Sequence, residues 1–154
     1  MAEPGPVGRN GFITTRVFDA ARERVWREWT EPARFADWFG GVECEVPLST
    51  VAMDVRPGGA LRATMFCGPG RHEIRWRGEY QEVAAPERLV FTITDLPRED
   101  RYELVSVLLT DLGDCRTEMR IEQRGHMRPD EYDRTKNGWG AFFARLDERL
   151  LTVD

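Results

Sequence analysis

The side chains that most often bind metals or act as nucleophiles are few in this sequence. His72 and His126 are its only histidines, and they lie far apart along the chain. A transition-metal site needs about three or four ligands. Cys44 and Cys67 together with both histidines would supply four, but no spacing in the sequence brings them together. We therefore predict no metal site, no cofactor and no cysteine nucleophile activated by a histidine.

The cysteines also bear on the cellular compartment. Cys44, Cys67 and Cys115 are odd in number and widely spaced, and no CxxC pair occurs. This excludes a zinc ribbon and a thioredoxin-type motif. Lone cysteines in a sequence without a secretory signal are typical of the reducing cytoplasm. We expect three unpaired cysteines and a cytoplasmic protein.

Length and charge narrow the function classes further. With 154 residues, 41% of them hydrophobic and 32% charged, the chain suits one soluble domain. A net charge of −5 argues against binding to nucleic-acid phosphates. No apolar run approaches the roughly 18 residues that a membrane span needs. We place a flexible N-terminal tail at 1–11 and a single domain at 12–154.

The basic residues are almost all arginine, because Lys136 is the only lysine. Arginine clusters often bind phosphate or carboxylate groups. Here, however, Arg24 and Arg149 have acidic residues as near neighbours in the sequence, as most of the other arginines do. Interspersed charges of both signs are typical of a solvated surface. We therefore assign the arginines to outward faces and not to a binding site.

The elements that must position any site begin with a strand and two short helices. An apolar and β-branched run predicts a strand over 12–18. Apolar residues at helical spacing predict a helix over about 21–29, with Asp19 as its N-cap. A second, short helix follows, capped by Thr30 and ending at the glycine pair that starts with Gly40.

The pattern then changes to strands joined by short turns. Apolar and polar residues alternate over 60–67 and 72–83, and again in three following strands. The chain ends in a long helix that opens at Pro129 and carries an apolar stripe from Trp139 to Leu150. Consecutive hairpins make an antiparallel sheet, and helices gathered on one face of such a sheet give an α+β fold.

The residues expected to face inward suggest a cavity between the sheet and the final helix. Several are small and lie between aromatic residues, which leaves space that a tightly packed core would fill. A mostly apolar cavity with a few polar groups is the usual small-molecule site. The alternative is a core that phenylalanine and tryptophan side chains fill. The expected lining comprises Leu61, Ala63, Met65, Cys67, Trp76, Gly78, Phe91, Ile93, Val107, Thr117, Met119, Ile121, Trp139, Phe142 and Phe143, with Tyr80, Gln123 and Thr135 as polar groups.

Five motifs in order along nearly the whole chain resemble one known family. They are VFDAARERVWREWTEPARFADWF at 17–39, DVRPGG at 54–59, GEY at 78–80, PERLV at 86–90 and GW at 138–139. Through these motifs the sequence resembles the heat-shock-protein-90 ATPase activator homologues of the START-like, or SRPBCC, superfamily. The resemblance implies the helix-grip fold, in which a curved antiparallel sheet wraps around a long C-terminal helix and an apolar cavity.

Three functions are compatible with this resemblance. The first, which we favour, is binding of an apolar small molecule in the cavity. The second is a protein-interaction or co-chaperone-like module. The third is an enzyme of the polyketide cyclase or aromatase kind, for which only Glu79, Tyr80 and His72 offer an acid or base, and Glu79 is expected to face outward. Exposed strand edges and the aromatic first helices would also allow a homodimer.

Overall fold

Eight strands and three α-helices make up the part of the chain that the computed structural model describes, residues 11–96 and 101–152. All but the last residue of the tail expected at 1–11 lies outside these residues. None of the described helices is long and apolar enough to cross a membrane. In chain order the helical elements are α2 (Arg22–Thr30), α3 (Pro32–Trp38), the 3₁₀ turn η1 (Leu48–Thr50) and α4 (Pro129–Leu150).

A single antiparallel sheet contains the eight described strands. Its order is β1-β8-β7-β6-β5-β4-β2, and the short strand β3 also pairs with β4. Neighbours in chain order from β4 to β8 are neighbours in the sheet, as hairpin connections require. The strands are β1 (Gly11–Phe18), β2 (Cys44–Glu45), β3 (Ala52–Met53), β4 (Ala60–Cys67), β5 (His72–Ala84), β6 (Arg88–Thr94), β7 (Glu103–Gly113) and β8 (Arg116–Arg124).

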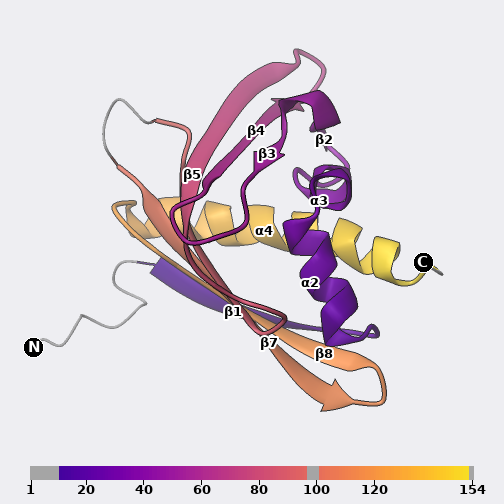
Figure 1. Ribbon diagram of the computed structural model, residues 1–154. Helices are drawn as coiled ribbons and strands as arrows, with labels where there is room; N and C mark the ends of the chain where they lie inside the picture. The colour runs from indigo at the N-terminus through magenta and orange to yellow at the C-terminus, as the bar shows by residue number, and fades with distance from the viewer. Residues whose placement is uncertain (1–10, 97–100, 153–154) are drawn as a thin grey trace, which may run out of the picture.

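The sheet curves around α4, which lies along its concave side (Figure 1). Val105 and Val107 on β7 and Met119 on β8 are almost completely buried and follow the predicted period of two. They belong to the same core cluster as Phe143 and Leu146 of α4. The predicted α+β architecture, with two short helices after the first strand, is therefore confirmed.

The two short helices lie where they were predicted, but their N-terminal caps differ. The N-cap position of α2 is Ala21, without a side-chain cap, and the predicted cap, Asp19, is exposed. The N-cap position of α3 is Glu31. Thr30 instead ends α2, and its hydroxyl donates to the Trp26 carbonyl at 2.9 Å. Threonine in a last helical turn readily makes this bond four residues back, which removes it from capping the next helix.

A buried carboxylate links the two short helices to the C-terminal end of α4. Glu28 is 1% exposed, and Arg149 donates to its two oxygens at 2.7 and 3.2 Å, while Arg34 donates at 3.3 Å. The bonds to Glu28 raise the pKa of Arg149 above its ordinary value. Arg24 donates to the backbone carbonyls of Arg149 and Leu150 at 3.1 and 2.9 Å. The assignment of Arg24 and Arg149 to fully solvated faces is wrong, because both are half-buried where α2 packs against α4.

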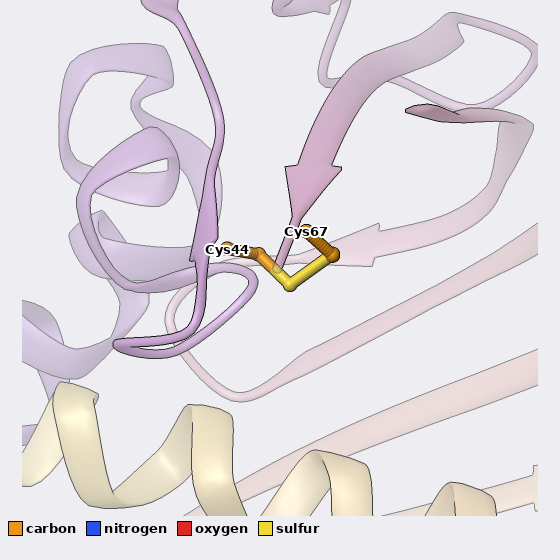
Figure 2. The surroundings of a disulfide bond; sticks show 2 residues. All are labelled: Cys44 and Cys67. Carbon is orange, nitrogen blue, oxygen red and sulfur yellow. A yellow bond between two sulfur atoms is a disulfide. The ribbon is translucent and has the colours of Figure 1, made fainter. Parts of the chain in front are cut away.

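Cys44 and Cys67 form a disulfide bond between β2 and the end of β4 (Figure 2). The two residues are direct partners in the antiparallel pairing of these strands, and their Cα atoms are 4.2 Å apart. The expectation of three unpaired cysteines is wrong because strand pairing joins residues that lie 23 positions apart in sequence. Cys115, in the turn between β7 and β8, is free and exposed.

Candidate functional site

A cavity of about 440 Å³ lies between the N-terminal half of α4 and one end of the sheet. Its wall combines Trp76 of β5, the ends of β6 and β8 with the loop residues beside them, the first residue of β7, one face of α4 and the residue after α3. This volume is within the range of small-molecule sites, about 300–1,000 Å³. The lining is apolar at Phe39, Trp76, Ile93, Leu96, Met127, Trp139 and Phe142, and polar or small at Thr94, Asp95, Arg101, Glu103, Gln123, Glu131, Thr135 and Gly138.

Four aromatic side chains make up most of the apolar wall. The centroid of the Phe39 ring lies 5.4 Å from that of Phe142, 6.0 Å from that of Trp139 and 6.3 Å from that of Trp76. The Trp139 and Phe142 rings are 5.7 Å apart. Tilted and edge-to-face contacts of this kind are the arrangements that aromatic rings prefer. The rings therefore hold one another in place around the cavity.

The polar end of the cavity is built around Glu103, which is 6% exposed. Its Oε1 accepts hydrogen bonds from Gln123 Nε2 at 3.1 Å and from the Tyr132 hydroxyl at 2.9 Å. Its Oε2 accepts one from the backbone N–H of His126 at 2.8 Å. Gln123 in turn accepts from the indole N–H of Trp139 at 2.9 Å. This network connects the buried carboxylate with the aromatic wall and joins β7, β8 and α4.

Strand phase brings these polar groups to the cavity. Glu103 begins β7 in the same phase as Val105, and Gln123 ends the inward row of β8, so both side chains face α4. Gly125 follows β8, and a Cβ at this position would overlap Glu103 Oε2. The carboxylate thus occupies space that a side chain at position 125 would fill.

Tyr132, near the start of α4, is nearly fully buried beside Glu103. Burial raises the pKa of the Tyr132 hydroxyl well above its usual value, and the hydrogen bond to Glu103 raises it further. The backbone N–H of Met127, which donates to the same oxygen at 3.3 Å, lowers the pKa by less than burial raises it, and by more than the bond to Glu103 raises it. At neutral pH the hydroxyl therefore keeps its proton and donates a hydrogen bond to Glu103.

The comparisons with known proteins bear on this arrangement. A family model described as Activator of Hsp90 ATPase homolog 1-like protein matches residues 19–150, which is most of the chain. The chain belongs to this family. The resemblance seen in the sequence motifs is therefore confirmed, and with it the START-like helix-grip fold.

Solved structures with the fold of this AHSA1-like protein come from several bacteria. Protein CV1439 of Chromobacterium violaceum superposes with a TM-score of 0.80 at 23% identity, over 94% of this chain and 99% of that one. The AHSA1 protein of Silicibacter pomeroyi superposes with a TM-score of 0.77 at 17% identity, over 90% and 96% of the two chains. At these identities the likeness shows the fold alone. No curated protein matches the sequence.

Six of the residues expected from the sequence to line a cavity lie at the wall of this cavity. They come from three strands and from α4. Two of the three expected polar groups are among them, and one of these belongs to the Glu103 network. The six are Trp76, Ile93, Gln123, Thr135, Trp139 and Phe142.

The other expected lining residues do not reach this cavity. Gly78 lies against the backbone of Thr92, where a Cβ would overlap the carbonyl oxygen. Cys67 is held in the disulfide, and Ala63 borders a second hollow, of about 370 Å³, on β4 and β5. The remaining ones are buried in the core: Leu61, Met65, Tyr80, Phe91, Val107, Thr117, Met119, Ile121 and Phe143.

Large side chains of α2 and α3 fill the interior next to these buried core residues. The Trp29 ring is 4.8 Å from the Trp38 ring and 6.2 Å from the Phe143 ring. The Trp29 indole N–H donates to Met119 Sδ at 3.3 Å, and that of Trp38 donates to the Glu28 carbonyl at 2.8 Å. Because these large side chains occupy the space, small residues on the neighbouring strands leave no cavity there.

Nine residues that line the cavity are absent from the lining expected from the sequence, among them Phe39, Glu103 and Gly138. The signal for Glu103 was its phase, since it precedes Val105 on the inward face, where a carboxylate is unusual. Gly138 precedes Trp139 on α4, and a Cβ built on it would have no atom within 4 Å. The missing side chain therefore contributes open space to the cavity.

The acid and base groups considered from the sequence do not come together at the cavity. His72 and Glu79 are exposed on β5, and neither lines the cavity. Tyr80 is buried with its ring 6.3 Å from that of Phe91, and its hydroxyl has no hydrogen-bond partner within the described residues. Burial raises the pKa of Tyr80 well above its usual value, and Asp54 raises it further.

Proposed function

We propose that this protein binds a small, largely apolar molecule in the cavity beside α4. The observation that carries the proposal is the cavity itself, with about 440 Å³ of space, an aromatic wall around Trp139 and one polar end at Glu103. Small-molecule sites generally combine apolar enclosure with a few well-placed polar groups. Family membership supports the fold, and the cavity supports the function.

Titration with the apolar fluorescent probe N-phenyl-1-naphthylamine tests the proposal. We expect a saturable rise in fluorescence with one site per chain. Gly138→Leu should weaken binding about tenfold or more, which corresponds to about 1.4 kcal/mol, because the new side chain enters the cavity.

Gly140→Leu is the matched control for that variant. Gly140 lies on the same helix and also has no atom within 4 Å of a built Cβ, but it does not line the cavity. It should bind the probe like the unchanged protein. The absence of saturable binding, or equal weakening in both variants, would contradict the proposal.

The family description supports a second candidate function, a module that activates the Hsp90 ATPase through protein contact. Its test is the Hsp90 ATPase rate, measured with increasing amounts of this protein. A saturable increase supports this candidate, and an unchanged rate at the highest concentration contradicts it. The Gly138→Leu variant separates the two functions, because filling the cavity should leave an external contact surface unchanged.

A further inference from the structure

We infer that the ligand of this cavity is an amine, with a protonated nitrogen directed at Glu103 and an apolar or aromatic body. The inference rests on the proposed function, since it names the chemical class that the same cavity would bind. In the described lining of the cavity, Asp95, Glu103 and Glu131 are acidic and Arg101 is basic.

The negative charge of Glu103 is buried among neutral donors. Its three described partners are the amide of Gln123, the hydroxyl of Tyr132 and the backbone N–H of His126. Arg101 is exposed, and its Nη2 donates to the His126 carbonyl at 3.0 Å. A buried charge without an opposite charge is unfavourable. A cation in the cavity would therefore be stabilised by Glu103.

Glu103 also has hydrogen-bonding capacity left for such a group. In all three bonds its oxygens are acceptors, two bonds on Oε1 and one on Oε2. An ionised carboxylate offers about four acceptor positions, and an ammonium group offers donors only. The free position on Oε2 therefore suits a nitrogen that carries protons better than a carboxylate or a carbonyl group.

The aromatic wall suits the rest of such a ligand. Gln123 bonds to both Glu103 and the Trp139 indole, so the ring lies two hydrogen bonds away from the carboxylate. Phe39 and Phe142 pack on Trp139 at 6.0 and 5.7 Å. Aromatic faces attract ammonium groups and bury apolar carbon. An arylalkylamine would satisfy both ends of the cavity at once.

Three probes with one carbon skeleton test the charge preference directly. We would measure displacement of N-phenyl-1-naphthylamine at pH 7 by 3-phenylpropylamine, 3-phenylpropan-1-ol and 3-phenylpropanoate. These differ mainly in a cationic, neutral or anionic head. We expect the amine to bind most tightly and the propanoate most weakly, with at least about a tenfold difference between the two.

Two variants then assign the preference to one side chain. Glu103→Gln keeps the size of the side chain and removes its charge, so the amine should lose about tenfold in affinity and the alcohol less than about twofold. Glu122→Gln removes the same charge from the opposite face of β8 and should change neither. Circular dichroism and thermal unfolding would show that both variants fold.

The outcomes separate this inference from the proposed function. If the propanoate or the alcohol binds as tightly as the amine while N-phenyl-1-naphthylamine still binds, the amine class is wrong and the cavity function stands. If neither the probe nor any of the three compounds binds, the proposed function fails as well. Should Glu103→Gln not fold, the ranking of the three compounds on the unchanged protein still decides the question.

Discussion

The two halves of α4 face different surroundings. In its C-terminal half, Phe143 packs among tryptophans of α2 and α3, and Arg149 is bonded to the buried carboxylate of Glu28. In its N-terminal half, Gly138 and Trp139 border a cavity. The same helix lies on the same sheet in both halves. The interior is filled where α2 and α3 pack against α4, and it stays open beside the N-terminal half of this helix.

The two buried carboxylates differ in the same way. Glu28 is neutralised by Arg149 and Arg34, whereas the described partners of Glu103 are neutral groups. A paired charge in a filled region contributes to stability, because removing one partner leaves the other buried and alone. We therefore expect changes near Glu28 to affect unfolding and changes near Glu103 to affect binding more than unfolding.

The largest effect is expected for Arg149→Met. It leaves Glu28 buried with Arg34 as its remaining described cation, and it should lower the free energy of unfolding by about 3–5 kcal/mol. Probe binding per folded molecule should stay unchanged. Urea unfolding measures the first quantity and fluorescence titration the second. Arg145→Met, four residues earlier beside the exposed Glu148, is the control and should cost less than about 1 kcal/mol. Equal losses would contradict the difference between the two halves.

Removal of the disulfide should have the next largest effect. Cys44 follows α3 closely and lies beside Gly40, so the bond fastens β2 next to the filled half. The double variant Cys44→Ser and Cys67→Ser should be less stable by about 2–4 kcal/mol under oxidising conditions. Thermal unfolding with and without a reductant measures this loss. Cys115→Ser should change nothing, and a reductant without effect on the unchanged protein would contradict the prediction.

A smaller effect is expected for Tyr132→Phe, which removes one donor to Glu103. We expect a loss of about 1–2 kcal/mol at neutral pH. The raised pKa means that the hydroxyl contributes stability below the unfolded pKa of about 10 and loses that contribution as the pH rises further. The difference between variant and unchanged protein should therefore shrink above about pH 10. Urea unfolding at neutral pH and above about pH 10 measures this difference in stability. Tyr102→Phe serves as the control.

The smallest effects are expected for alanine in place of the two helical glycines. Gly138→Ala and Gly140→Ala should each raise the free energy of unfolding by about 0.5–1 kcal/mol, because both positions have room for a Cβ. Only Gly138→Ala should weaken probe binding, and by a few-fold. Thermal unfolding and titration of both variants measure these changes. A destabilised Gly138→Ala protein would show that the cavity is not open beside α4.

Phase along the strands predicted the inward face well and the cavity only in part. The row that contains Met119 and Ile121 is buried as its alternation indicates. The same alternation places Glu103 inward, but the sequence does not show which groups would donate hydrogen bonds to its carboxylate. Gln123 and His126 reach Glu103 through the pairing of β7 with β8, and Tyr132, 29 positions away, reaches it only once α4 crosses the sheet.

Local pattern by itself determined the elements of this protein. Alternation over the strands, the apolar stripe of the final helix and the family motifs lead to a curved sheet around α4, because these signals depend on residues close together in the chain. The tertiary structure decided the rest. The Cys44–Cys67 bond, the pairing of Glu28 with Arg149 across 121 positions and the end of the interior that stays open depend on long-range packing, which no short stretch of sequence encodes.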